Sequence, residues 1–500
     1  MLHKKLVFFC KFIKSQSVLF QLMNFFSLLF IRRNAMKTRS SICFYLFYRI
    51  MICGFLLFTL NACGGLTSKN TMSSNEYRPS ASTSGKWTLV SGDTRPNRPA
   101  SYGTRGIAGR SNNPGSRYGS VSWTDGNGNL WLFGGDSGRN SEKLCNDLWK
   151  FDGINWTWIS GDSKPNQPGI YDSIGTASGR GNPGARYGSI SWTDSNGNFW
   201  LFGGQGYGSK RLKGYLNDLW KFDGTNWTWI SGDNLLDRRG DYGDKGVTAG
   251  TSKPGARANS ISWIDGKGNL WLFGGYGYAG TGFIGYLNDL WKFDGTNWTW
   301  VSGDIRTSQE GVYGDKGVAN DKNIPGARSN SVSWIDSKGN LWLFGGFGAD
   351  SYRLAGMLND LWKFDGINWT WVSGENSTSN WQGVYGTMGV ADSQNRPKAR
   401  SDSISWIDGK DNLWLFGGVS PNNRQKTLLN DLWKFDGTNW TWVSGNNPEN
   451  QMFFEDPDNI SHPRARLGSV SWADNEGNLW LFGGRRLSSD FFNDLWKFEP

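Results

Sequence analysis

Histidine and usable cysteine are scarce in this chain. Its 500 residues hold two histidines, His3 and His462, and five cysteines, three of which precede Cys63. Once the N-terminal region with His3 is set aside, His462 alone cannot supply a Ser-His-Asp triad or a site with two histidine ligands, so we expect no metal and no cofactor. Cys63 and Cys145 remain, which excludes a framework of disulfides.

Two further features are missing after residue 85: a sustained apolar period of 3.6 residues, and an excess of charge of one sign. The first absence argues against helices and favours short aromatic strands between Gly- and Asn-rich turns, in keeping with 30 Trp and 69 Gly. The formal charge of +10 reflects nine Lys and Arg within residues 1–62, and the remainder has 44 basic against 43 acidic residues. A near-neutral body gives no reason to expect nucleic acid as a partner.

Residues 1–62 are predicted to be a signal or targeting region, with Met36 a possible true start. The sequence MICGFLLFTLNAC at 51–63 contains an apolar run of about ten residues, too short to span a bilayer as a helix. Its end, LNAC, resembles the lipobox of bacterial lipoproteins, which implies that Cys63 becomes the lipidated first residue. A non-lipidated signal peptide or a plain anchor helix is the alternative.

Residues 63–85 are then the lipidated cysteine and a Ser/Thr-rich tether, expected to be flexible. The protein is expected to be exported and held to a bacterial membrane, the outer membrane for example, by its lipid alone. It would face the periplasm or the cell surface. Residues 86–500 are left for the folded domain.

Six repeats fill residues 86–500. One landmark Trp per repeat recurs at spacings of 69, 71, 71, 72 and 66 residues: Trp123, Trp192, Trp263, Trp334, Trp406 and Trp472. Each repeat contains four strand-like runs, a to d, which in the third repeat are 260–265, 269–275, 289–294 and 297–303. Turns rich in Gly, Asn and Asp join a to b and c to d.

The strands are apolar on both faces. In strand b of the third repeat, Leu270 and Leu272 point one way while Trp271 and Phe273 point the other. A sheet of this kind needs neighbours on both sides, which radial repetition around an axis provides. The sequence therefore predicts an all-β fold, a six-bladed β-propeller of four-stranded blades.

The two ends of the domain complement each other. The sixth repeat stops at Pro500 after strand c, whereas KWTLVSGD at 86–93 matches the strand d sequence NWTWVSGD. We expect the N-terminal segment to supply the missing strand d of the last blade and to close the ring.

Four recurring features resemble kelch-repeat propellers of the galactose-oxidase-like superfamily: an Arg before strand a, a Gly-Gly pair ending strand b, an Asn-Asp opening strand c, and the Trp of strand d. The resemblance covers about residues 86–500 and implies the fold, which hosts enzymes, adaptors and ligand binders alike. Copper radical oxidases of the superfamily need two His ligands and a Cys linked to a Tyr, which this chain cannot supply. Kelch units run near 50 residues; these run near 70, with long inserts between strands d and a.

The d–a and b–c connections are expected on one face, which should carry the function. The b–c connections differ most between repeats, and their aromatic residues suit stacking on sugar rings or anchoring a protein. Packing against the d–a inserts is the alternative. These ligand-binding candidates are Tyr207, Tyr215, Tyr276, Tyr278, Phe283, Tyr286, Phe347 and Tyr352.

Six arginines just before strand a form a second set of candidates. A ring of guanidinium groups near the axis would suit carboxylate or phosphate ligands. The alternative is that each arginine pairs with the Asp that opens strand c of the same repeat, since both lie on the same face. The arginines are Arg117, Arg186, Arg257, Arg328, Arg400 and Arg466.

These observations favour a surface or periplasmic propeller, expected to be monomeric, that recognises a glycan or an envelope protein through its loop-rich face. One alternative is a metal-independent sugar mutarotase or epimerase resembling sialic-acid mutarotases, with carboxylates such as Glu310 and Asp315 available on the loops. Another is a structural or adhesive envelope protein. The scarcity of histidine argues against a copper radical oxidase and a Ser-His-Asp hydrolase, so the sequence leans away from an enzyme without excluding one.

Overall fold

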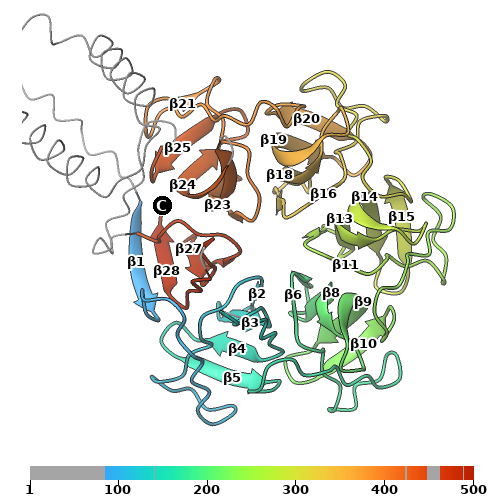
Figure 1. Ribbon diagram of the computed structural model, residues 1–500, viewed down its shortest axis with the longest axis vertical. Helices are drawn as coiled ribbons and strands as arrows, with labels where there is room; N and C mark the ends of the chain where they lie inside the picture. The colour runs from blue at the N-terminus through green and yellow to red at the C-terminus, as the bar shows by residue number, and fades with distance from the viewer. Residues whose placement is uncertain (1–84, 140, 423–424, 448–461, 488) are drawn as a thin grey trace, which may run out of the picture. The chain divides into compact units, whose positions relative to one another are not determined.

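A computed structural model describes residues 85–139, 141–422, 425–447, 462–487 and 489–500. The targeting region, Cys63 and the tether lie outside the described residues. The described part is all-β and forms six antiparallel blades around an axis (Figure 1). It contains no helix with the length and apolar character of a membrane span. The predicted propeller is therefore confirmed.

The strands follow the repeats, with strand a innermost. Blades 1 to 3 contain β2 (Val121–Thr124), β3 (Leu130–Phe133), β4 (Leu148–Phe151) and β5 (Trp156–Ser160); β6 (Arg186–Tyr187), β7 (Ile190–Thr193), β8 (Phe199–Tyr207), β9 (Lys213–Phe222) and β10 (Trp227–Ser231); and β11 (Arg257–Ala258), β12 (Ile261–Ile264), β13 (Leu270–Tyr278), β14 (Ile284–Phe293) and β15 (Trp298–Ser302).

Blades 4 to 6 contain β16 (Arg328–Ser329), β17 (Val332–Ile335), β18 (Leu341–Ala349), β19 (Ala355–Phe364) and β20 (Trp369–Ser373); β21 (Ala391–Asp392), β22 (Ile404–Ile407), β23 (Leu413–Asn422), β24 (Gln425–Phe435) and β25 (Trp440–Ser444); and β26 (Val470–Ala473), β27 (Leu479–Phe482), β28 (Leu495–Glu499) and β1 (Lys86–Ser91). The last blade thus combines both ends of the domain.

The N-terminal strand closes the ring as expected. β1 pairs antiparallel with β28, with Trp87 opposite Phe498 and Leu89 opposite Trp496. Trp87 is 9% exposed, and its ring lies 5.4 Å from that of Phe416 in the neighbouring blade. The strand therefore contributes both backbone pairing and core packing.

The hydrophobic core is divided among the six blade interfaces. Each interface buries Trp, Phe and Leu from facing sheets; between blades 3 and 4, for example, Trp263 and Phe273 pack with Trp362 and Phe364. The sixth cluster joins blades 6 and 1, where Trp472 and Trp480 meet Trp149. Burying a large side chain of this kind stabilises the fold by about 1.5–3 kcal/mol. The apolar character of both sheet faces is thus explained.

Two closed rings of hydrogen bonds join the innermost strands. In the first, a backbone N–H of each blade donates to the matching carbonyl of the preceding blade over 2.7–3.1 Å, through Gly119, Gly188, Asn259, Asn330, Asp402 and Gly468. All six have positive φ, which Gly, Asn and Asp tolerate best. In the second, serine hydroxyls donate to the preceding serine carbonyl over 3.0–3.3 Å, through Ser122, Ser191, Ser262, Ser333, Ser405 and Ser471.

The long d–a inserts cover the outer edge of the next blade. A glycine N–H of each described insert donates to a Trp carbonyl of the following strand d over 2.7–2.8 Å: Gly106 to Trp158, Gly175 to Trp229, Gly246 to Trp300, Gly317 to Trp371 and Gly389 to Trp442. In this way five edge strands gain partners, which protects them from pairing with other chains. The extra length of these repeats therefore has a structural use that the sequence did not reveal.

Candidate functional site

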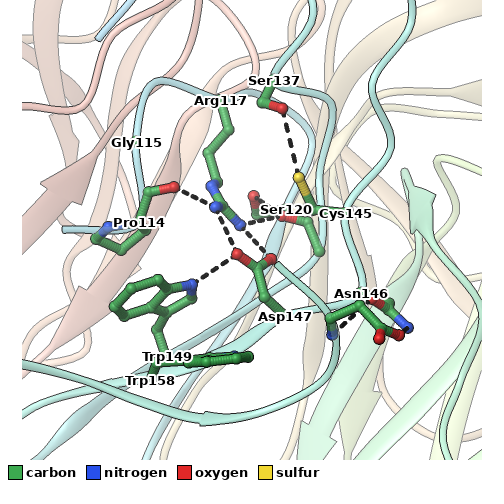
Figure 2. Close-up of polar contacts among 12 residues, drawn as sticks. Pro114, Gly115, Arg117, Ser120, Ser137, Cys145, Asn146, Asp147, Trp149 and Trp158 are labelled. Atoms are coloured by element: carbon green, nitrogen blue, oxygen red, sulfur yellow. Dashed lines mark hydrogen bonds and ion pairs between the residues drawn. The ribbon is translucent and has the colours of Figure 1, made fainter. Parts of the chain in front are cut away.

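The six arginines before strand a are engaged in buried ion pairs. Each is at most 2% exposed and binds the Asp that opens strand c through two parallel hydrogen bonds of 2.6–2.8 Å. Arg117 and Asp147 show the arrangement in the first blade (Figure 2). The partners of the others are Asp218, Asp289, Asp360, Asp431 and Asp494.

The same aspartates collect further donors. The Oδ2 atom accepts from the indole of the Trp two residues later, over 2.7–2.8 Å. In blades 1 to 5 it also accepts from an insert tyrosine over 2.5–2.9 Å: Tyr102, Tyr171, Tyr242, Tyr313 and Tyr385. Burial, and then the Asp289 charge, raise the pKa of Tyr242 well above its usual value.

The role of Arg117, Arg186, Arg257, Arg328, Arg400 and Arg466 as anion ligands is therefore withdrawn. Their guanidinium groups are buried and neutralised by aspartate, and the Nη1 atom also donates to the first carbonyl of the Gly-Gly pair. Pairing with aspartate, the alternative that the sequence left open, is what the structure contains.

The Gly-Gly pair marks a boundary along each strand b. Gly274 and Gly275 both have positive φ, and a Cβ on Gly274 would lie 2.8 Å from the carbonyl oxygen of Arg328 in the next blade. A side chain is therefore excluded where two blades approach most closely. Beyond this point strands b and c continue on the loop face in blades 2 to 5 but not in blades 1 and 6, and there the repeats diverge.

One row of residues lies just beyond each Gly-Gly pair, three cross-strand neighbours per blade, and we call it the loop-face layer. Its members are Tyr118, Asp136 and Leu144; Tyr187, Gln205 and Tyr215; Ala258, Tyr276 and Tyr286; Ser329, Phe347 and Met357; Ser401, Val419 and Leu428; and Leu467, Arg485 and Phe491. No two blades have the same composition in this row.

Five of the predicted aromatic candidates come together in and beside this layer. Tyr215 of blade 2 lies 6.0 Å from Tyr276 and 6.3 Å from Tyr278 of blade 3, measured between ring centroids. Tyr276 continues to Tyr286 at 5.0 Å, and Tyr286 to Phe347 of blade 4 at 5.4 Å. All five are half-buried. We call this group the aromatic arc.

The other three aromatic candidates lie elsewhere on the hairpins. Tyr207 is opposite Lys213 at the end of the β8–β9 hairpin. Phe283 and Tyr352 are 74% and 66% exposed, between the strands of their hairpins. The structure therefore divides the candidates into a clustered set and a peripheral set.

The b–c connections are largely strand rather than loop. In blades 2 to 5 the paired strands b and c run for nine to eleven residues each, as in β13 and β14. In blades 1 and 6 the corresponding strands have four or five residues. Extended hairpins thus flank the aromatic arc, and short ones border Tyr118 and Arg485.

The polar part of the layer was missed by sequence reasoning. The Arg485 guanidinium lies 4.2 Å from the ring centroid of Tyr118, which in turn is 5.8 Å from Tyr187 and 5.5 Å from Phe491. Asp402, of the inner backbone ring, accepts hydrogen bonds from Ser401 (2.8 Å) and from the amide of Asn330. Burial raises the pKa of Asp402, although these bonds and the charges of Arg485 and Lys426 oppose it.

The thiol, the imidazole and the carboxylates considered for catalysis or metal binding do not lie together among the described residues. Cys145 is buried, and burial raises the pKa of its thiol to about 11. His462 faces the carbonyl of Pro463, and no three His, Cys, Asp or Glu side chains gather in a geometry that holds a metal in the described ranges. Glu310 and Asp315, the carboxylates available to the mutarotase alternative, are exposed on the insert that runs along β20.

On the opposite face, a cleft of about 780 Å³ lies between blades 3 and 4. Its lining includes the a–b turns of both blades, whose first Asp recurs in every repeat. Asp265, one of them, caps its turn by accepting from the backbone of Lys267 and Asn269 and from the indole of Trp271. Burial opposes its ionisation, but the hydrogen bonds from Asn269 and Trp271 prevail and lower the pKa of Asp265.

Comparisons with known proteins yield distant structural likenesses. No protein-family model and no curated protein matches this sequence. The solved structure of YjhT is similar at 14% identity, with a TM-score of 0.48, over 77% of this chain and 95% of that chain. A fungal alcohol oxidase of the AA5 family, in complex with copper, is similar at 12% identity, with a TM-score of 0.41, over 80% of this chain and 77% of its own.

Proposed function

We propose that this propeller binds a carbohydrate at the aromatic arc of its loop face. The observation that carries the proposal is the contact of five half-buried aromatic rings across blades 2 to 4, at positions where the other blades have different residues. Such rings offer apolar faces for stacking on sugar C–H groups, and the four tyrosines add hydroxyls that hydrogen-bond to sugar oxygens.

The state of those hydroxyls supports the same role. Burial, and then the neighbouring tyrosines and Asp237, raise the pKa of Tyr215 to about 12, so its phenol stays protonated at neutral pH. A neutral phenol both donates and accepts hydrogen bonds, as sugar hydroxyls do. The arc therefore combines an apolar surface with uncharged polar groups.

The test is a glycan array probed with the purified full-length protein, followed by titration of the best ligand. Replacing Tyr276 by Ala removes the central ring of the arc and is expected to raise the Kd at least about tenfold. The matched control is Phe283→Ala, which removes an exposed ring outside the arc and is expected to leave the Kd unchanged.

A protein partner is the competing outcome. If no glycan binds and a pull-down from the native envelope recovers a protein whose capture depends on Tyr276, the carbohydrate proposal fails in favour of protein recognition. Equal effects of Y276A and F283A would instead remove the arc from the binding site.

The proposal includes attachment to the bacterial envelope through lipid on Cys63, as the LNAC sequence indicates. Metabolic labelling with a palmitate analogue is expected to mark the wild-type protein and not the Cys63→Ser variant. Labelling of both, or of neither, would contradict the lipid anchor without affecting the carbohydrate site.

A further inference from the structure

We propose that Arg485 binds an anionic group of the ligand, so that the carbohydrate recognised at the loop face is an acidic one bearing a carboxylate or a sulfate. This inference rests on the proposed function and specifies its ligand. It starts from a contrast between Arg485 and the six buried arginines, each of which is neutralised by an aspartate through two parallel hydrogen bonds.

Arg485 lacks such acceptors. Its Nε atom is buried and has no hydrogen-bond partner, and no ion pair joins its side chain to a carboxylate of the described residues. The guanidinium is held instead over the ring of Tyr118 at 4.2 Å. A cation–π contact fixes the group in place while leaving its N–H donors without acceptors. A half-buried cation in this state is suited to an incoming anion.

The neighbouring carboxylates are occupied by other donors. Asp136 accepts at Oδ1 from the backbone N–H groups of Gly138 and Lys143. Asp402 accepts from Ser401 and Asn330. Both act on Arg485 only at a distance, and burial raises the pKa of each, which lowers the tendency of these groups to ionise.

Two more charges near this part of the loop face compensate each other. Glu142 forms an ion pair with Lys213, which links the b–c connection of blade 1 to β9 of blade 2. Lys426, exposed on β24, is a second cation that influences Asp402. The half-buried Arg485 is the better placed of the two cations, because its position is fixed by an aromatic ring.

Arg485 is also connected to the aromatic arc. Tyr118, beneath its guanidinium, lies 5.8 Å from Tyr187, measured between ring centroids. The Tyr187 hydroxyl donates to Gln205, which is the cross-strand neighbour of Tyr215, the first ring of the arc. A saccharide stacked on the arc thus has a continuous polar and aromatic path to the cation.

The experiment uses the full-length protein and matched pairs of glycans: galacturonate and glucuronate oligosaccharides with their methyl esters, and sulfated oligosaccharides with their desulfated forms. Wild-type protein is expected to bind the charged member of a pair at least about tenfold more tightly. Arg485→Gln is expected to abolish that preference while retaining the affinity for the neutral member. Arg211→Gln, which removes an exposed charge from the β8–β9 hairpin, is the control and should retain the preference.

A second measurement separates the two proposals. Crystals soaked in selenate are expected to show anomalous density at Arg485 in the wild type and none in R485Q. If glycans bind without a preference for charge and no selenate density appears at Arg485, the anion site is refuted and the carbohydrate proposal stands. Selenate at Arg485 without any glycan binding would support the anion site and refute the carbohydrate proposal.

Discussion

The strands on the two sides of the Gly-Gly pairs differ in kind. Below the pairs, the Arg–Asp–Trp network recurs six times, with bond lengths that vary by about 0.2 Å. Above them, the loop-face layer changes from Tyr118 and Asp136 in one blade to Tyr276 and Tyr286 in another. The comparison teaches that one stretch of each strand stabilises the ring, while the next presents a surface free to vary.

The largest effect should follow from removing the closing strand. Deletion of residues 86–92 takes Trp87 from the last interface and leaves β28 paired with β27 alone. Loss of a buried Trp alone costs about 3–5 kcal/mol, so we expect the cooperative thermal transition to be lost or strongly lowered. Calorimetry measures this, with a deletion of similar length within 66–76 as the control. A deletion variant that melts like its parent would refute ring closure by β1.

The next effect concerns the repeated network. Arg257→Gln leaves the carboxylate of Asp289 buried without its cation, which costs about 3–5 kcal/mol. Arg485→Gln, in the loop-face layer, should change the free energy of unfolding by less than about 0.5 kcal/mol. Urea denaturation compares the two variants. Similar losses of unfolding free energy in both variants would contradict the idea that only the part of the strand with the buried network stabilises the ring.

A smaller effect is expected from the insert tyrosines. Tyr242→Phe keeps the ring packed against Trp291 and removes the hydroxyl that donates to Asp289. Hydrogen bonds to charged groups contribute about 1.5–3 kcal/mol, and chemical denaturation should show a loss at or below that range. An unchanged free energy of unfolding would mean that the inserts cap the blades without contributing to the buried network.

The smallest effect is a difference in pH dependence. Burial raises the pKa of Asp402, so its contribution to stability is present at low pH and lost as the pH rises through the folded-state pKa. Burial also favours a higher pKa for Asp431, but the charge and hydrogen bonds of Arg400 outweigh burial and lower the pKa. The contribution of Asp431 to stability is therefore lost as the pH falls. Asp402→Asn should therefore gain stability relative to the wild type as the pH rises from about 4 to 7. A loss of stability of this variant relative to the wild type over the same pH range would contradict the raised pKa of Asp402.

The sequence predicted the scaffold well because its signals are local and repeated six times. The blade count and the closing strand follow from motifs that recur in every repeat, and the regular spacing of residues such as Arg257 and Asp289 left Arg–Asp pairing open as an alternative. The contact of Tyr242 with the next blade could not be predicted, since it depends on the path of an insert through space. The shared Tyr of the inserts was the one signal that could have suggested it.

The candidate site was predicted in part. The aromatic residues were recognised by composition, yet which of them meet depends on the hairpin lengths and on the cross-strand register. Arg485 was overlooked because a single arginine in a variable stretch has no pattern to mark it. Aligning the six repeats and asking where they differ just beyond the Gly-Gly pair would have identified its position.

The path of the inserts has a consequence for how such a ring can grow or shrink. Each described insert, within repeats of about 71 residues, covers the blade that follows it, as Gly246 does for Trp300. Duplication of a segment of that length among the first five repeats would therefore add a blade together with a cover for it. For the five described inserts, the linkage between neighbours thus keeps each blade and its cover together in consecutive segments of the chain.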